Sequence, residues 1–208
     1  MNGTAHMIIG AGTGFLAAHY IQAPPADTIV LIGAGGVSGL IPDLDVDGKL
    51  SNTFTSSYKF LMTLVQLMGI AVIVYSWWSG AGQEMWKGIS AGLGMMLVSA
   101  FIKKRHLLTV AGGGALAGGI FLAETWLLLF GVYIVIASLV SHRSYTHSLI
   151  GLAFFVVIAY YLQASIKTEG ILLACAGGYA SHLISDMRWL PFNKRGIKLF
   201  LPVSRKEF

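Results

Sequence analysis

Long uncharged stretches limit the possible folds of this sequence more than any other feature. Residues 107–123, 125–142 and 144–166 contain no Asp, Glu, Lys or Arg. The whole chain of 208 residues has 14 basic and 9 acidic side chains, 11% of the total, whereas a soluble domain usually has about a quarter. Disordered chains are even more polar, and a single cysteine, Cys175, excludes a disulfide scaffold. The sequence therefore predicts an integral membrane protein.

Apolar segments bounded by polar residues, Gly or Pro predict an all-α, polytopic membrane bundle of about eight membrane-embedded helices. A membrane-spanning helix needs about 20 apolar residues, and six of the segments approach this length. The first two are shorter and glycine-rich, so they could be half-spans or interfacial helices. We expect one integral membrane domain over residues 1–208, with the first segment retained because no basic residue precedes it. The segments are His6–Gln22, Ile29–Ile41, Phe60–Ser79, Met85–Ile102, Leu107–Ala123, Trp126–Val140, Ser148–Gln163 and Ile171–Met187.

Basic residues predict the orientation of these segments. If all eight cross the membrane, twelve of the 14 basic residues lie on one side, and the exceptions are Lys87 and Lys167. The positive-inside rule makes that side cytoplasmic, with both termini and a basic tail at residues 188–208. The tail would be attracted to membrane lipids with anionic headgroups, or it could serve as a topology determinant alone. The net charge of +5 therefore needs no nucleic acid partner.

Glycine pairs at a spacing of four residues indicate close helix packing in lipid. The sequence around Gly10 and Gly14 is not a dinucleotide-binding loop, because no strand precedes it. The pairs are Gly10 and Gly14, Gly35 and Gly39, and Gly88 and Gly92.

Most histidines, and several aspartates, fall at the predicted cytoplasmic ends of the segments. Because ionisable groups at the membrane boundary are costly to desolvate, they pair with each other, bind an ion or line a watery cavity. We leave out His19 and His106 as candidate ligands. The residues at this face are His6, Asp43, Asp45, Asp47, His106, His142, His147, His182 and Asp186.

His182 and Asp186 are four residues apart and therefore share one helix face. This spacing suits two ligands of one metal ion or of a metal pair, and an intrahelical hydrogen bond is the alternative.

His142 and His147 are five residues apart, which is too wide for one face of a helix. The spacing is suitable if His142 lies in a loop and Ser144 or Thr146 caps the helix that follows. A cap and a metal ligand can both be present here.

The sequence from Pro42 to Gly48 has Asp at alternate positions, like the start of a calcium loop. Phe54 occupies the position where an EF-hand has its bidentate Glu, so an EF-hand is not expected. A helix stop with an Asx turn is the alternative to metal binding by Asp43 and Asp45.

Together these residues offer a mixed nitrogen and oxygen ligand set. It suits zinc best, with manganese or iron as alternatives, and one or two ions. Arg143 could bind a phosphate or stabilise a developing oxyanion, while Thr146, Ser148 and Ser181 could orient the ligands. Asp43, Asp45 or Asp186 could accept the proton of the attacking water.

Five motifs in this order resemble the YdjM-like bacterial inner-membrane proteins, which are described as LexA-regulated, metal-dependent hydrolases. One departure is Ala5, because the family more often has Thr directly before His. The motifs are Thr4-Ala5-His6, Pro42-Asp43-Leu44-Asp45, His142-Arg143-Ser144-Tyr145-Thr146-His147-Ser148, Ser181-His182-Leu183-Ile184-Ser185-Asp186 and Gly196-Ile197-Lys198-Leu199-Phe200-Leu201-Pro202.

The resemblance implies a membrane-bound hydrolase that takes part in the SOS response and activates water with its metal at the cytoplasmic membrane face. A remote similarity of that family to zinc-dependent phospholipase C and P1-type nucleases favours a phosphoester substrate, with an ester or a lipid as further possibilities. An ion-binding transporter and a membrane scaffold are the alternatives. The ligands that the resemblance implies are His6, Asp43, Asp45, His142, His147, His182 and Asp186.

Overall fold

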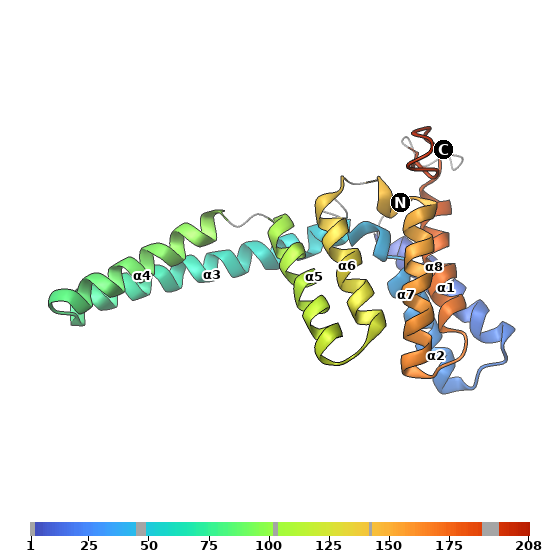
Figure 1. The fold of residues 1–208 in the computed structure, drawn as a ribbon, viewed down its shortest axis with the longest axis horizontal. Coiled ribbons are helices and arrows are strands. Elements are labelled where there is room, and N and C mark those ends of the chain that lie inside the picture. The colour runs from blue at the N-terminus through green and yellow to red at the C-terminus, as the bar shows by residue number, and fades with distance from the viewer. Residues whose placement is uncertain (1–2, 45–48, 102–103, 142, 189–195) are drawn as a thin grey trace. The chain divides into compact units, whose positions relative to one another are not determined.

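The computed structural model describes residues 3–44, 49–101, 104–141, 143–188 and 196–208, and these residues are all-helical, as predicted (Figure 1). They form eight α-helices and two short 3-10 turns, with no strand among them. The elements are α1 (Gly3–Tyr20), α2 (Pro25–Ser38), η1 (Ile41–Leu44), α3 (Lys49–Ser79), α4 (Gly82–Phe101), α5 (Lys104–Phe121), α6 (Thr125–Leu139), η2 (Tyr145–His147), α7 (Leu149–Ile166) and α8 (Ile171–Asp186).

Two compact units make up the chain, one of residues 52–107 and one of residues 1–51 with 108–208. In the smaller unit, α3 and α4 form a helical hairpin (Figure 1). A β-carbon on Gly69 would lie 2.9 Å from the carbonyl oxygen of Gly92, so the two backbones touch at these glycines. Helix α3 begins at Lys49 and not at Phe60, because no Gly or Pro interrupts the polar sequence that precedes the apolar part.

In the larger unit, glycines bring α1, α2 and α8 into backbone contact. A β-carbon on Gly39 would lie 2.6 Å from the carbonyl oxygen of His6. Gly10 meets the backbone of Gly35, and Gly178 of α8 meets Gly35 as well. The predicted glycine packing is therefore confirmed, and it brings His6 on α1 close to α8 and to the turn after α2.

Apolar side chains from α2, α6, α7 and α8 fill the core of this unit. Leu31, Phe155 and Tyr179 are among its buried residues. The C-terminal residues pack against the same unit, where Ile197 and Phe208 exchange two backbone hydrogen bonds of 3.1 and 3.0 Å. The amide of Leu149 donates to the carbonyl of Leu199, which satisfies one of the amides at the start of α7.

One helix of the described chain, Leu149–Ile166, is long and apolar enough to cross a membrane, with a mean hydropathy of 2.1. Pro25–Ser38, His106–Phe121 and Thr125–Leu139 are apolar but shorter. A helix of 15 residues covers about 22 Å, against about 30 Å for the hydrocarbon core. The polytopic arrangement is therefore not confirmed.

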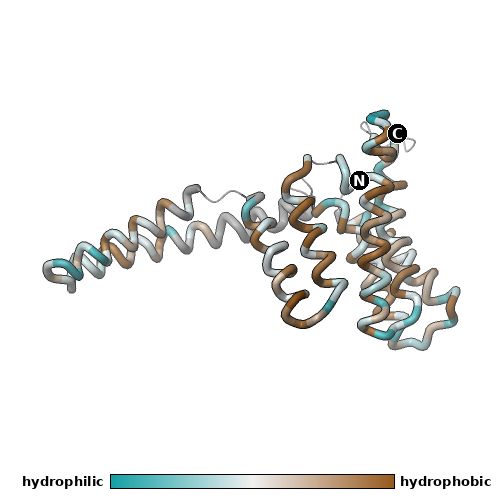
Figure 2. Tube along the Cα trace, viewed as in Figure 1, coloured by the Kyte–Doolittle hydropathy of each residue, from teal (hydrophilic) through white to brown (hydrophobic). Residues whose placement is uncertain are grey.

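Large apolar side chains are exposed along several helices of the larger unit. Ile8 on α1, Ile29 on α2 and Leu139 on α6 are each more than 60% exposed. Figure 2 shows hydrophobic residues along most of α6 and α7. Surfaces of this kind favour contact with lipid or with a partner.

Candidate metal centre

Five of the predicted ligands come together in one buried cluster in the larger unit. Each is at most 3% exposed, although they come from four elements that are far apart in the sequence. The other two predicted ligands, Asp45 and His142, lie outside the described residues, and so does Asp47. The cluster consists of His6 on α1, Asp43 in η1, His147 in η2, and His182 and Asp186 on α8.

The centre of the cluster is formed by His147, His182 and Asp43. The Nε2 atoms of the two histidines are 3.2 Å apart. Oδ1 of Asp43 lies 3.5 Å from Nε2 of His147 and 3.7 Å from Nε2 of His182. Two ligand atoms of one tetrahedral ion, with bonds of about 2.0 to 2.1 Å, are about 3.3 Å apart. These three atoms are therefore spaced as ligands of a single transition-metal ion would be.

Hydrogen bonds to the far ring nitrogens hold both imidazoles in place. Nδ1 of His182 lies 2.7 Å from the carbonyl oxygen of Gly39, and this oxygen can only accept. The proton of His182 is thus on Nδ1, and the lone pair of Nε2 faces His147 and Asp43. Nδ1 of His147 lies 3.1 Å from Oγ1 of Thr146. Contacts of this kind orient the histidine ligands of metals, and the carbonyl of Gly39 also fixes the tautomer of His182.

His6 contacts the ring face of His182, whereas His147 meets this ring edge-on. The ring of His6 stacks on that of His182 with 3.8 Å between centroids, and its Nε2 lies 3.2 Å from Oδ1 of Asp186. Nδ1 of His6 is buried and has no hydrogen-bond partner among the described residues. A buried ring nitrogen without a partner is rare, and a metal ion would satisfy it.

Asp186 connects the histidines with Arg143. Its Oδ2 lies 3.8 Å from Nε2 of His182, 3.9 Å from Nε2 of His147 and 3.7 Å from a terminal nitrogen of Arg143. Arg143 has a positive φ of 59°, in a region that L-residues seldom adopt. Its side chain is 27% exposed, in contrast to the buried carboxylate of Asp186.

The chemistry of the donor set fits a divalent cation. Two buried carboxylates lie among imidazoles, and burying their charge is costly unless a cation compensates for it. Two overlapping triads each have ligand atoms within 4.8 Å of one another. One triad is His6, Asp43 and His182, and the other is His147, His182 and Asp186.

One alternative and two smaller predictions about the site are wrong. His182 and Asp186 form no intrahelical hydrogen bond, because 3.8 Å separates their atoms. Ser148 caps α7 by accepting from the amide of Gly151 at 3.3 Å, where we expected Ser144 or Thr146. The hydroxyl of Ser181 donates to the carbonyl of Gly178 in its own helix and does not orient a ligand.

Thr146 does contact a proposed ligand, as expected, whereas two other contributors were missed. The first is the carbonyl of Gly39, which accepts a hydrogen bond from His182. No sequence pattern other than the glycine pair indicates this contact. Tyr179 donates a hydrogen bond to the carbonyl of Thr146 and is fully buried. It precedes His182 by three residues and Asp186 by seven, so the helical period could have identified it.

The fold and the site together define an all-helical protein with buried His and Asp residues that could hold a metal ion. The chain matches the family described as YdjM inner membrane protein over residues 1–208, and it belongs to this family. This confirms the resemblance seen in the sequence motifs and indicates an inner membrane protein. No curated protein and no solved structure matches the chain.

Proposed function

We propose that the protein is a membrane-bound, metal-dependent hydrolase that acts on a phosphoester at the cytoplasmic face of the membrane. The observation that carries this proposal is the spacing of Nε2 of His147, Nε2 of His182 and Oδ1 of Asp43. These three buried atoms lie between 3.2 and 3.7 Å from one another. Membership of an inner membrane protein family supports the location.

Zinc is the ion we propose, because imidazole and carboxylate donors at this spacing suit it, and manganese or iron can use the same donors. One ion is the minimum, and it would be held by His147, His182 and Asp43, whose ligand atoms lie within 3.7 Å of one another. Nδ1 of His6, which has no hydrogen-bond partner among the described residues, would be a ligand of a second ion.

A bound divalent ion supplies Lewis acidity, which polarises the phosphoester and makes a water molecule more acidic. The chain positions the other groups. The guanidinium of Arg143, held by Asp186, binds a phosphate oxygen and the negative charge that develops on it. Asp45, two residues after Asp43, is our candidate for the proton acceptor on the basis of its position in the sequence.

The position of the cluster supports a site at the membrane surface over an ion relay at mid-membrane depth. His6 lies near the start of α1, and Asp186 is the last residue of α8. Asp43 and His147 lie in short 3-10 turns between helices. We propose that these helix ends face the cytoplasm, in a polytopic arrangement in which twelve of the 14 basic residues lie on that side.

A hydrolysis assay tests this function. The protein is reconstituted in nanodiscs, treated with a chelator, and given Zn²⁺, Mn²⁺ or Fe²⁺ in turn. The substrates are bis(p-nitrophenyl) phosphate, p-nitrophenyl phosphate and p-nitrophenyl acetate. We expect metal-dependent hydrolysis of a phosphoester that is lost in His147→Ala and kept in His19→Ala, whose side chain is exposed. Hydrolysis that needs no metal, or that survives His147→Ala, would overturn the proposal.

A further inference from the structure

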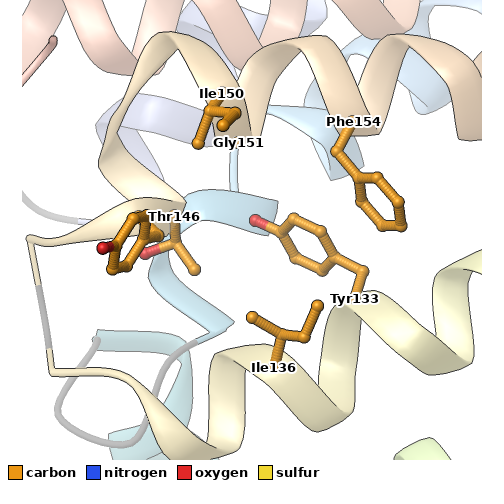
Figure 3. A pocket seen from close by; sticks show the side chains of 7 residues that line it. Tyr133, Ile136, Thr146, Ile150, Gly151 and Phe154 are labelled. Atoms are coloured by element: carbon orange, nitrogen blue, oxygen red, sulfur yellow. The ribbon is translucent and has the colours of Figure 1, made fainter. Parts of the chain in front are cut away.

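An apolar cavity of about 240 Å³ lies between α6, η2 and α7 (Figure 3). Figure 3 shows Tyr133 and Ile136 of α6 on one side and Ile150 and Phe154 of α7 on the other. The cavity is larger than the roughly 150 Å³ that accommodate a benzene molecule in an engineered protein core. It therefore has room for part of a hydrocarbon chain.

One short segment connects this cavity to the candidate metal centre. Tyr145 and Thr146 line the cavity, while Arg143 and His147 of the same segment contact Asp186. Oγ1 of Thr146 lies 3.1 Å from Nδ1 of His147. A ligand with its phosphate at Arg143 could thus place an attached chain in the cavity.

The hydroxyl of Tyr133, which lines the cavity, is already hydrogen-bonded within the protein. The hydroxyls of Tyr133 and Tyr179 are 3.0 Å apart, and Tyr179 donates to the carbonyl of Thr146. Tyr133 therefore donates to Tyr179. The lining then consists mainly of aromatic rings, aliphatic side chains and the backbone at Gly151, which suits an apolar ligand.

The cavity adjoins an exposed apolar surface. Ile136 and Ile150, which line it, are 46% and 51% exposed, and Leu139 and Leu149 beside them are 64% and 44% exposed. Helix α7, which supplies one wall, is the one helix among the described residues with the length and composition to cross a membrane. A chain could therefore enter from lipid without passing through water.

We propose that this cavity binds the hydrocarbon chain of a lipid phosphoester, so that the substrate of the metal centre is a membrane lipid. The inference rests on the proposed function. In this proposal, Ile136, Ile150 and Phe154 contact the hydrocarbon chain and determine the specificity for the substrate, whereas the metal ligands do not.

Two readouts test this proposal, and one of them needs no activity. The first is photolabelling of metal-free protein in nanodiscs by dodecyl phosphate with a diazirine near the chain end, with mass spectrometry to map the labelled peptides. The second is the KM for butyl, hexyl, octyl and dodecyl phosphates. Ile136→Trp fills the cavity, and Leu139→Trp makes the same change one helical turn away, outside it.

We expect label on peptides from α6 and α7, reduced at least about tenfold in Ile136→Trp and unchanged in Leu139→Trp. The KM should fall by up to about fourfold per added methylene group until the cavity is full. Equal labelling of the two variants, or a KM independent of chain length, would overturn the inference and leave the proposed function intact. Labelling in the cavity without any hydrolysis would overturn the proposed function and leave the hydrocarbon site intact.

Discussion

Thr146→Val isolates the hydrogen bond that orients His147. Valine has nearly the shape of threonine, and the backbone carbonyl that accepts from Tyr179 is kept. The substitution therefore removes the contact of 3.1 Å between Oγ1 of Thr146 and Nδ1 of His147. Both side chains are buried, with at most 3% of their surface exposed.

The expected loss follows from this geometry. When Nε2 of His147 binds the metal, Nδ1 carries the proton, and its N–H donates a hydrogen bond to Oγ1 of Thr146. Removal of such a partner weakens metal binding by about 10-fold to 100-fold, or about 1.4 to 2.8 kcal/mol. The measurement is the zinc dissociation constant from competition with a chromophoric chelator, on detergent-purified protein at one fixed pH.

Thr109→Val is the matched control for this experiment. It removes a hydrogen bond of 2.8 Å to Ser138, between α5 and α6, and leaves the cluster untouched. We expect wild-type zinc affinity for this variant. If both variants bind zinc equally well, Thr146 does not orient His147. That result would also refute our assignment of Nε2 as the atom of His147 that binds the metal.

Three further predictions concern packing, the phosphate site and metal linkage. Gly178→Ala forces a β-carbon against the carbonyl oxygen of Gly35 and should lower the free energy of unfolding by about 1 to 3 kcal/mol. Gly113→Ala is the control, because its β-carbon would meet no atom within 4 Å, and thermal unfolding measures both variants. Arg143→Gln should lower kcat for a phosphoester about 100-fold with metal content unchanged, and loss of the metal would instead make it a structural residue. Zinc at 100 times its dissociation constant should stabilise the wild type by about 2.7 kcal/mol in a thermal melt, and an equal shift in His182→Ala would contradict the site.

The fold class could be predicted because scarcity of charge and helical spacing are local properties of the sequence. The glycine contacts were predictable for the same reason, since a spacing of four residues places Gly35 and Gly39 on one face. Helix ends were less predictable. Hydropathy reports where a chain is apolar, but α3 extends through the polar residues after Lys49 because nothing there breaks a helix.

The membership of the cluster could be predicted in part, since alternating segments bring His6 and His182 to one end of the bundle. The orientation of each ring could not, because it depends on partners from other elements. The carbonyl of Gly39 selects the tautomer of His182, and a backbone carbonyl is present at every residue of the chain. Tertiary packing also decided that His182 binds this carbonyl and not Asp186.

The metal content of the purified protein tests the central claim most directly. Protein is purified without added metal or chelator, and zinc, manganese and iron are counted per chain by mass spectrometry, for the wild type, His19→Ala and His147→Ala/His182→Ala. We predict at least one equivalent of transition metal in the first two and less than a tenth of that in the double variant. Less than one equivalent in the wild type, with no further loss in the double variant, would contradict the metal centre.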